Sequence, residues 1–345
     1  MPTKPNKAGK PQNYVPAGNG DASGEYGNET GSNKHFTNFK KSESSFDSVN
    51  KQRMGDKLSA QVKAAPVEKN DEETDVYKGW EDSILTQERV GNPPEEIKVR
   101  MEDTPIKRID DTEINAVKSK YRPETVDKAA ALIRKYEGSV DETASMLEGL
   151  ADKMGGMMVG MPFRLKRLGS LSRKIESYII EENEKGNMNA TVDDAIANMK
   201  DTARFTMMFD PDNFESNVQK TMNELQQNGY KMVKAKNTFT EGSSYKGLNC
   251  NFIDKAGNIF ELQFHIPLSM QVKEGIYGDI ASKKVISDRT KVTAHDIYET
   301  TREIEDKIKK GTATPDEIKL NKVLTAKGIK MWSAVPNFDF AFLKK

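Results

Sequence analysis

The segment Phe260-Glu-Leu-Gln-Phe-His265, within a strand expected over 258–266, alternates strictly between apolar and polar side chains. A period of two residues places alternate side chains on opposite faces of a β-strand. One face then carries aromatic and aliphatic groups, and the other carries Glu261, Gln263 and His265. A carboxylate inside such a run is costly to bury unless it is paired or binds a cation. The segment therefore predicts a strand with one core face, whose polar face is either a site or an ordinary solvent-facing surface.

The neighbouring sequence predicts a single α+β domain around this strand. Asp254-Lys-Ala-Gly257 is a turn signal that would pair the strand with 247–253 as a hairpin. The methionine-rich stretch 154–162 is expected to be a flexible connection that can pack as adaptable core. Two more strands are expected at 204–209 and 230–239. Helices are expected to begin near Pro123 and to cover 139–153, 170–182, 191–199, 214–228, 268–285, 293–309 and 315–326. Such a domain has a mixed sheet of about four to five strands flanked by helices.

The sequence before this domain consists of two segments that differ in composition. Residues 1–70 contain one leucine and no isoleucine, tryptophan or cysteine. A segment this poor in apolar side chains cannot offset the entropy of ordering its backbone. Residues 71–120 are acidic and mixed, with one short element expected at 76–85, and Pro93, Pro94 and Pro105 argue against a long helix there. The prediction is a low-complexity, largely disordered tail over 1–120 and an α+β domain over 121–345.

Charge and cysteine content exclude several classes of protein. The 53 basic and 53 acidic residues cancel, which argues against generic nucleic-acid binding. Cys250 is the only cysteine, so neither an internal disulfide nor a cysteine-based zinc site can form. The sequence has no run of 18 apolar residues and no apolar segment of a secretory signal, so we expect a cytoplasmic protein without a membrane partner.

A basic stretch follows the methionine-rich segment, in the pattern Arg164-x-Lys166-x-x-x-Ser170-x-x-x-Lys174. Side chains two apart share a face of an extended chain, and residues four apart share a face of a helix. Three cations could therefore converge near a helix N-terminus, which is a favourable place for phosphate. The alternative is a solvated basic start of a helix.

Two carboxylates are candidates for a metal site. Asp201 precedes one predicted strand in the pattern Asp201-x-x-Arg204, and Glu261 lies within another. Adjacent strands could bring them to one face of the sheet. Magnesium prefers oxygen ligands, which are often one or two carboxylates together with phosphate oxygens.

Two further motifs could contact a second substrate. The pattern Tyr245-Lys246-x-x-Asn249 follows a polar loop, and a tyrosine there could stack on a base. The pattern His295-x-x-Tyr298-x-x-x-Arg302 lies along one helix face. The alternatives are an ordinary tyrosine at the start of a strand and a helix that caps the sheet.

These motifs, in this order from Arg164 to Arg302, resemble the synthetase domain of the RelA/SpoT family of alarmone synthetases. The resemblance implies a nucleotidyltransferase-like fold and a Mg²⁺-dependent transfer of pyrophosphate from ATP to the 3′-hydroxyl of a nucleotide. Toxin members of the family modify adenosine nucleotides or the 3′ end of tRNA instead. The implied partners are thus ATP and a nucleotide or tRNA acceptor.

The resemblance also implies a role for each matching residue. It assigns ATP phosphates to the R-x-K-x-x-x-S-x-x-x-K stretch, catalysis to Glu261, Asp201 and Arg204, and the metal to Asp201 and Glu261. It assigns acceptor binding to Tyr245, Lys246, Asn249, Gln263, His265 and His295. The chain departs from the family where D-x-x-G-x-R becomes Asp201-Thr-Ala-Arg204 and where Y-x-S-x-H becomes Tyr245-Lys-Gly-Leu-Asn249.

Two biological settings follow from the resemblance. No hydrolase motif precedes the domain, and an unregulated synthetase is toxic, which implies a toxin or effector. The segments 12–18 and 20–27 are similar to tails of phage head-associated or injected proteins. This similarity implies an effector packaged in a phage virion and injected. The alternative is a catalytically inactive relative that serves as a virion structural or interaction protein among phage proteins.

Overall fold

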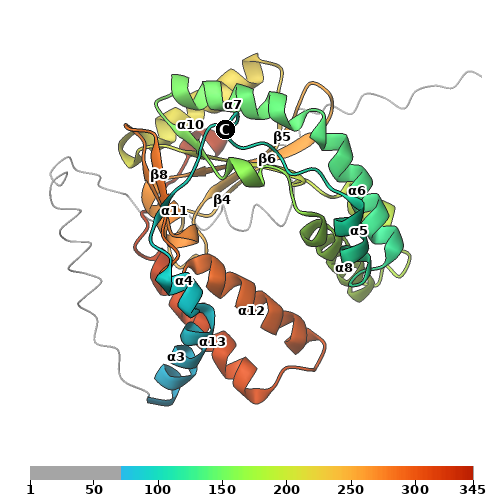
Figure 1. The fold of residues 1–345 in the computed structure, drawn as a ribbon. Coiled ribbons are helices and arrows are strands. Elements are labelled where there is room, and N and C mark those ends of the chain that lie inside the picture. The colour runs from blue at the N-terminus through green and yellow to red at the C-terminus, as the bar shows by residue number, and fades with distance from the viewer. Residues whose placement is uncertain (1–70, 345) are drawn as a thin grey trace, which may run out of the picture. The chain divides into compact units, whose positions relative to one another are not determined.

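The computed structural model describes residues 71–344, so the predicted tail up to residue 70 lies outside the described residues. A five-stranded sheet has the strand order β2-β3-β6-β5-β4 (Figure 1). β3 and β6 are parallel, and the other neighbouring pairs are antiparallel. The prediction of an α+β fold with a mixed sheet flanked by helices is confirmed. The strands are β2 (Met157–Val159), β3 (Ala203–Met208), β4 (Lys231–Asn237), β5 (Leu248–Ile253) and β6 (Ile259–His265).

The predicted alternation of β6 is present in the structure. Phe260, Leu262 and Phe264 are buried in the main core, which also includes residues of α7 (Val140–Lys153) and α10 (Phe214–Gln227). Burying each such side chain contributes about 1.5–3 kcal/mol, so this face holds the sheet to the helices. The opposite face of β6 is left to polar side chains. The methionine-rich stretch 154–162 contributes β2 to this sheet as buried core.

A second core lies among four helices, namely α5 (Asp111–Lys118), α6 (Pro123–Glu137), α8 (Leu168–Glu184) and α9 (Val192–Ala197). α9 begins at Thr191, as predicted, because a capping box forms there. The Thr191 hydroxyl accepts from the Asp194 N–H at 3.1 Å, and the Asp194 carboxylate accepts from the Thr191 N–H at 2.9 Å. This cap fixes where the chain turns before β3.

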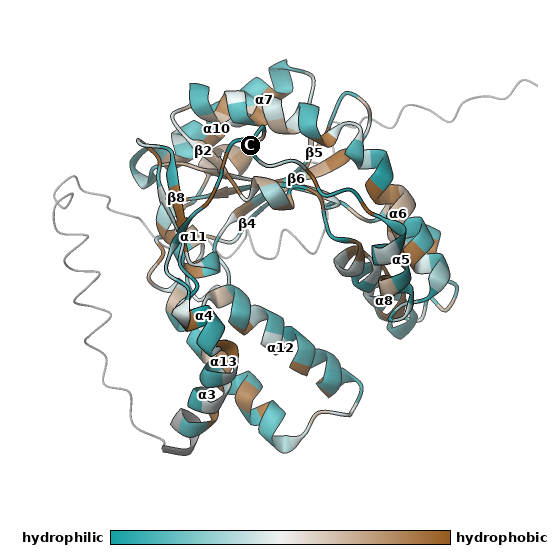
Figure 2. Ribbon diagram, in the orientation of Figure 1, coloured by the Kyte–Doolittle hydropathy of each residue, from teal (hydrophilic) through white to brown (hydrophobic). Residues whose placement is uncertain are grey.

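A third group of helices consists of α3 (Asp71–Ile84), α12 (Ala294–Lys309) and α13 (Pro315–Trp332). Trp80 packs with Ile297 and Leu324, and its indole N–H donates to the Thr300 hydroxyl at 3.1 Å. α12 is largely hydrophilic (Figure 2). α3 lies where a short element was expected at 76–85, and Trp80 gives this helix an apolar anchor on α12 and α13.

A small sheet of order β1-β8-β7 corrects the helix predicted over 268–285. α11 (Pro267–Glu274) ends at Gly275, which has a φ of +68°. A Cβ on Gly275 would lie 2.2 Å from the Asp288 carbonyl oxygen, so only glycine allows this close approach. The chain then forms β7 (Ile276–Asp279) and β8 (Lys284–Ser287), and β8 pairs with β1 (Glu95–Glu96).

The remaining short elements are α4 (Gln87–Gly91) and the 3₁₀ turns η2 (Met161–Phe163), η3 (Pro211–Asn213) and η4 (Ala341–Lys344). Within residues 71–344, the structure contains no helix that is both long and apolar enough to cross a membrane.

Candidate active site

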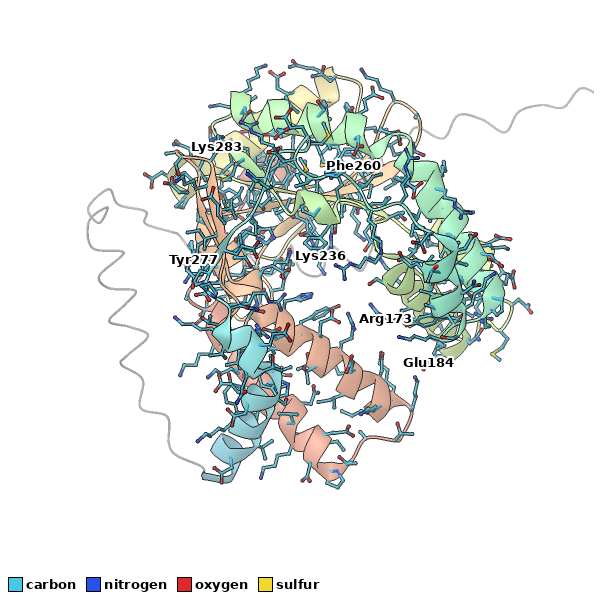
Figure 3. The ribbon with its side chains drawn as sticks, viewed as in Figure 1. Arg173, Glu184, Lys236, Phe260, Tyr277 and Lys283 are labelled. Carbon is cyan, nitrogen blue, oxygen red and sulfur yellow. The ribbon has the colours of Figure 1, made fainter. Side chains whose placement is uncertain are left out.

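Charged and amide side chains line up across the polar face of the central sheet. The register places Arg204 of β3 opposite Glu261 of β6, Glu261 opposite Asn251 of β5, and Asn251 opposite Lys234 of β4. The next row along the strands is Thr206, Gln263, Asn249 and Lys236. Figure 3 labels Lys236 on this face of the sheet. The central carboxylate thus lies between basic residues on two other strands of the sheet, a pattern suited to a phosphorylated ligand.

Asp201 joins two of the predicted phosphate-binding residues. Its two carboxylate oxygens accept from the ammonium groups of Lys166 and Lys174, each at 2.7 Å. Lys166 lies on the segment before α8, and its backbone N–H donates to the Thr202 carbonyl. Lys174 lies in the second turn of α8. Ser170 lies exposed in the first turn of that helix. The predicted convergence of Lys166 and Lys174 near a helix N-terminus is therefore present in the structure.

The ion pairs leave Asp201 strongly ionised. Burial raises the pKa of this carboxyl, but the charges and hydrogen bonds of Lys166 and Lys174 outweigh burial and lower the pKa to about 2. Burial also lowers the pKa of Lys166, which the Asp201 carboxylate only partly offsets. The cluster therefore stabilises the charged form of Asp201, whereas burial destabilises the charged form of Lys166.

Arg164 does not share the face of Lys166. It follows η2 with helical backbone angles, φ −62° and ψ −18°, so the alternation expected for an extended chain fails at this residue. Its guanidinium is buried, bonds to the Asp141 carboxylate at 2.8 Å, and donates to the carbonyls of Thr104 and Met161. Arg164 thus links the segments that carry Thr104, Asp141 and Met161. Of the three cations predicted to cluster, only Lys166 and Lys174 do so.

A hydrogen-bonded chain runs along the polar face through Gln263. The Gln263 amide N–H donates to Glu261 Oε2 at 2.8 Å, and the ammonium of Lys273 donates to Gln263 Oε1 at 3.1 Å. Lys273 lies in the last turn of α11 and was missed by the sequence analysis. Burial lowers the pKa of this lysine, and the Glu274 carboxylate partly offsets the effect. One sequence signal could have identified Lys273. It lies one helical turn after Ser269, in the helix that directly follows the polar strand.

Tyr245, Asn249 and His265, which were predicted to bind the acceptor, come together in the structure. The Tyr245 hydroxyl lies 3.0 Å from Asn249 Oδ1 and 3.1 Å from His265 Nε2. The Ser269 hydroxyl donates to the Ile266 carbonyl and lies 2.9 Å from His265 Nδ1. Burial raises the pKa of Tyr245 and lowers that of His265, so both side chains are neutral at pH 7.

Two other predicted acceptor residues lie apart from this trio. The buried ammonium of Lys246 donates to the Val335 carbonyl at 2.6 Å and to Asn337 Oδ1 at 2.7 Å, so it holds the C-terminal segment. His295 lies on α12 with Nδ1 3.9 Å from Glu274 and Nε2 3.9 Å from Glu299. His295 therefore touches the end of α11 rather than the strands.

The donor set suits a hard cation such as Mg²⁺. The candidate ligands are the carboxylates of Asp201 and Glu261, and oxygen is the ligand atom that magnesium prefers. Within residues 71–344, no point gathers three or more aspartate, glutamate, histidine or cysteine side chains suited to a metal. Both Asp201 oxygens accept from lysine ammonium groups, so a metal that arrives with a nucleotide would have to displace those ion pairs before the two carboxylates, phosphate oxygens and water could complete its site.

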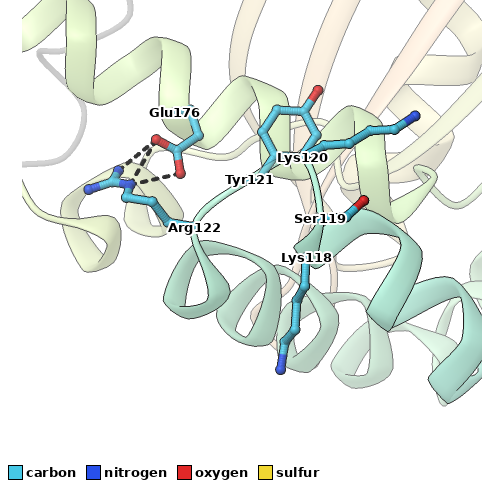
Figure 4. Close-up of a pocket in the computed structure, with 6 residues that line it drawn as sticks. All are labelled: Lys118, Ser119, Lys120, Tyr121, Arg122 and Glu176. Carbon is cyan, nitrogen blue, oxygen red and sulfur yellow. Dashed lines mark hydrogen bonds and ion pairs between the residues drawn. The ribbon is translucent and has the colours of Figure 1, made fainter.

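A surface hollow elsewhere is lined by none of the predicted site residues. Figure 4 shows it between the loop after α5 and α8, where the Arg122 guanidinium bonds to both Glu176 oxygens at 2.8 and 2.9 Å. The polar face of the central sheet therefore remains the candidate site.

Comparison with known proteins yields structural likeness only. No protein-family model and no curated protein matches the chain. Similar solved structures include the complex of the type VI effector Tas1 with its immunity protein, at 18% identity and a TM-score of 0.32, covering 61% of this chain and 94% of that chain. The small alarmone synthetase 1 from Bacillus subtilis bound to its product pppGpp has 12% identity and a TM-score of 0.31, covering 60% and 93%.

A GTP pyrophosphokinase family protein from Streptococcus pneumoniae has 14% identity and a TM-score of 0.31, covering 59% of this chain and 88% of that chain. Likeness this low assigns no role to any residue of this chain.

Proposed function

We propose that the chain transfers pyrophosphate from ATP to the 3′-hydroxyl of a nucleotide or tRNA acceptor and acts as a toxin or effector. The observation that carries this proposal is the row of Arg204 and Glu261 on parallel neighbouring strands, with the Lys166–Asp201–Lys174 cluster just before β3. This arrangement combines a carboxylate that can accept a proton with cations that can bind phosphate.

The ATP phosphates would contact Lys166, Lys174 and Ser170, with the N-terminal N–H groups of α8 beside them. Arg204 would stabilise negative charge next to Glu261. Arg164 supports the segment that carries Lys166 instead of binding phosphate itself. Asp201 and Glu261 would hold Mg²⁺, which supplies charge neutralisation at the phosphates when bound.

The transfer step is a substitution at phosphorus. The acceptor 3′-oxygen bonds to the β-phosphorus of ATP, the bond between that phosphorus and the α–β bridging oxygen breaks, and AMP leaves. The hydroxyl proton moves to Glu261 and then to solvent. Catalysis of this kind depends chiefly on positioning and charge stabilisation, which this cluster of fixed charges would supply.

The acceptor would lie toward Tyr245, Asn249 and His265. Because Tyr245 and His265 are neutral at pH 7, they would act as hydrogen-bonding groups and not as charges. Gln263 lies beside this region on β6, whereas His295 lies against Glu274 at the end of α11. An ATP-dependent activity would operate in the cytoplasm, and delivery by a phage virion belongs to the same proposal.

One observation favours the alternative, an inactive relative that serves as a virion structural or interaction protein. Both oxygens of Asp201 are already bonded to lysines. Magnesium binding would need those ion pairs to rearrange, whereas a structural module would keep them.

Label transfer separates the two functions. The full chain would be incubated with Mg²⁺, ATP labelled at its β- and γ-phosphates, and a panel of GDP, GTP, AMP, ADP, ATP and bulk tRNA. Glu261→Gln removes the proposed proton acceptor, and Glu303→Gln on exposed α12 is the matched control. We expect labelled acceptor with the wild type and Glu303→Gln but not with Glu261→Gln. Absence of transfer to every acceptor by folded wild-type protein would favour the structural alternative.

A further inference from the structure

Lys273 is a buried cation that lies beside the candidate site but is not among the predicted site residues. This lysine lies on α11, outside the strands that carry the predicted site, yet its ammonium reaches the polar face of the sheet. Its side chain is 16% exposed. A lysine this buried normally needs a close carboxylate, but the nearest one within residues 71–344 is Glu274, at 3.8 Å. This ion pair is long, and the ammonium is otherwise held by the neutral Gln263 amide and lies 6.0 Å from the Tyr245 ring centroid, so burial of the charge is only weakly offset.

The Gln263 amide is held at both ends. The ammonium of Lys273 bonds to Oε1, and Nε2 bonds to Glu261 Oε2. The reverse orientation of the amide would place N–H groups against the ammonium and the carbonyl oxygen against the carboxylate. Both contacts would then be repulsive, so the cation and the carboxylate together select one orientation.

The position of Lys273 is itself fixed by the fold. The first turn of α11 is anchored by Ser269, whose hydroxyl lies against the His265 ring, and the last turn ends at Gly275, where a Cβ would meet the Asp288 carbonyl. Lys273 lies one helical turn after Ser269. α11 therefore presents the ammonium to β6 in a fixed register.

We propose that Lys273 is a positioning residue that acts through Gln263 to fix Glu261 Oε2, leaving Oε1 as the oxygen that receives the acceptor proton. This inference rests on the proposed function for its chemical consequence, but the Lys273–Gln263–Glu261 chain can be tested without it. Misplacing a reacting group by about 1 Å lowers a rate by about a hundredfold, which sets the size of the expected effect.

The first test reports on the chain of contacts directly. In ¹⁵N-labelled full-length protein, the side-chain amide signals of Gln263 would be assigned by their disappearance in Gln263→Met. Lys273→Met should shift these signals and speed their exchange with solvent, while Lys273→Arg should retain most of the wild-type pattern. Lys322→Met, at an exposed position of α13, is the matched control and should leave them unchanged. Unchanged Gln263 signals in Lys273→Met would overturn the proposal.

The second test separates positioning from a merely structural role. Lys273→Met should lower kcat about a hundredfold with little change in the KM for ATP, and Lys273→Arg should restore much of the activity. The urea midpoint of Lys273→Met should equal or exceed that of the wild type, since a buried cation is removed. In a Gln263→Met background, Lys273→Met should have little further effect on kcat.

A lowered urea midpoint, or an equal loss of kcat in both backgrounds, would refute action through Gln263. If wild-type protein transfers no label at all, the proposed function fails, while the Gln263 amide signals still decide the role of Lys273.

Discussion

Removal of the Asp201 carboxylate tests the partly buried ion pairs that it forms with Lys166 and Lys174. Folding lowers the pKa of Asp201 from 3.8 to about 2 because Lys166 and Lys174 outweigh the effect of burial. A difference of about 1.8 pH units, at about 1.36 kcal/mol for each, corresponds to about 2.4 kcal/mol. Asp201→Asn also leaves the Lys166 ammonium, 16% exposed, without its counter-ion. We expect the free energy of unfolding at pH 7 to fall by about 2–3 kcal/mol.

The assay is urea unfolding with a matched surface control. Asp152 contacts Arg100 and Lys283, but its carboxylate is 41% exposed, so Asp152→Asn should cost less than about 1 kcal/mol. Because the pKa of Asp201 is depressed in the folded state, its contribution is present above pH 3.8 and is lost as the pH falls toward 2. At pH 3, about half of it should remain. Equal losses for the two variants, or a loss for Asp201→Asn that does not shrink at pH 3, would refute the reasoning.

Two further predictions concern packing and a buried histidine. A Cβ on Gly156 would lie 2.3 Å from the Phe209 ring, whereas a Cβ on Gly278 would meet the flexible side-chain ends of Met208 and Met157. Gly156→Ala should therefore lower the free energy of unfolding by about 1–3 kcal/mol, and more than Gly278→Ala does, as measured by urea unfolding. Burial lowers the pKa of His265 well below 6.5. Wild-type stability should therefore fall as the pH drops below about 6.5, because only the unfolded chain takes up the proton, and His265→Gln should flatten that slope; an unchanged slope would contradict the burial argument.

Local patterns predicted much of the sheet. The alternation of β6 follows from neighbouring residues alone, and the turn at Gly257 joins β5 to β6 as expected. The spacing of Thr191 and Asp194 likewise predicted Thr191 as the capping residue of α9. Each of these features is decided within a few residues of sequence, where propensity and hydrogen bonding act together.

The sequence patterns failed where distant residues decide the outcome. Lys246 bonds to the Val335 carbonyl, 89 residues away, and no local signal marks that contact. Gly275 ends α11 early because the Asp288 carbonyl approaches it. Lys273 joins the candidate site only after the end of α11 is known. Alternation misplaced Arg164, because η2 changes its backbone angles.

The C-terminal segment that Lys246 holds has a consequence for synthesis of the chain. The Phe338 ring packs on Phe214 with ring centroids 4.7 Å apart, and the Asp339 N–H donates to the Glu215 carboxylate across 124 residues. A ribosome adds about 5–20 residues per second, so about 6–25 s pass between the synthesis of the start of α10 and that of these partners. During that interval the aromatic surface of Phe214 and Phe239 is open to solvent. The sheet can therefore complete its core only after residues 338 and 339 have been synthesised, and until then the nascent chain presents a binding surface for chaperones.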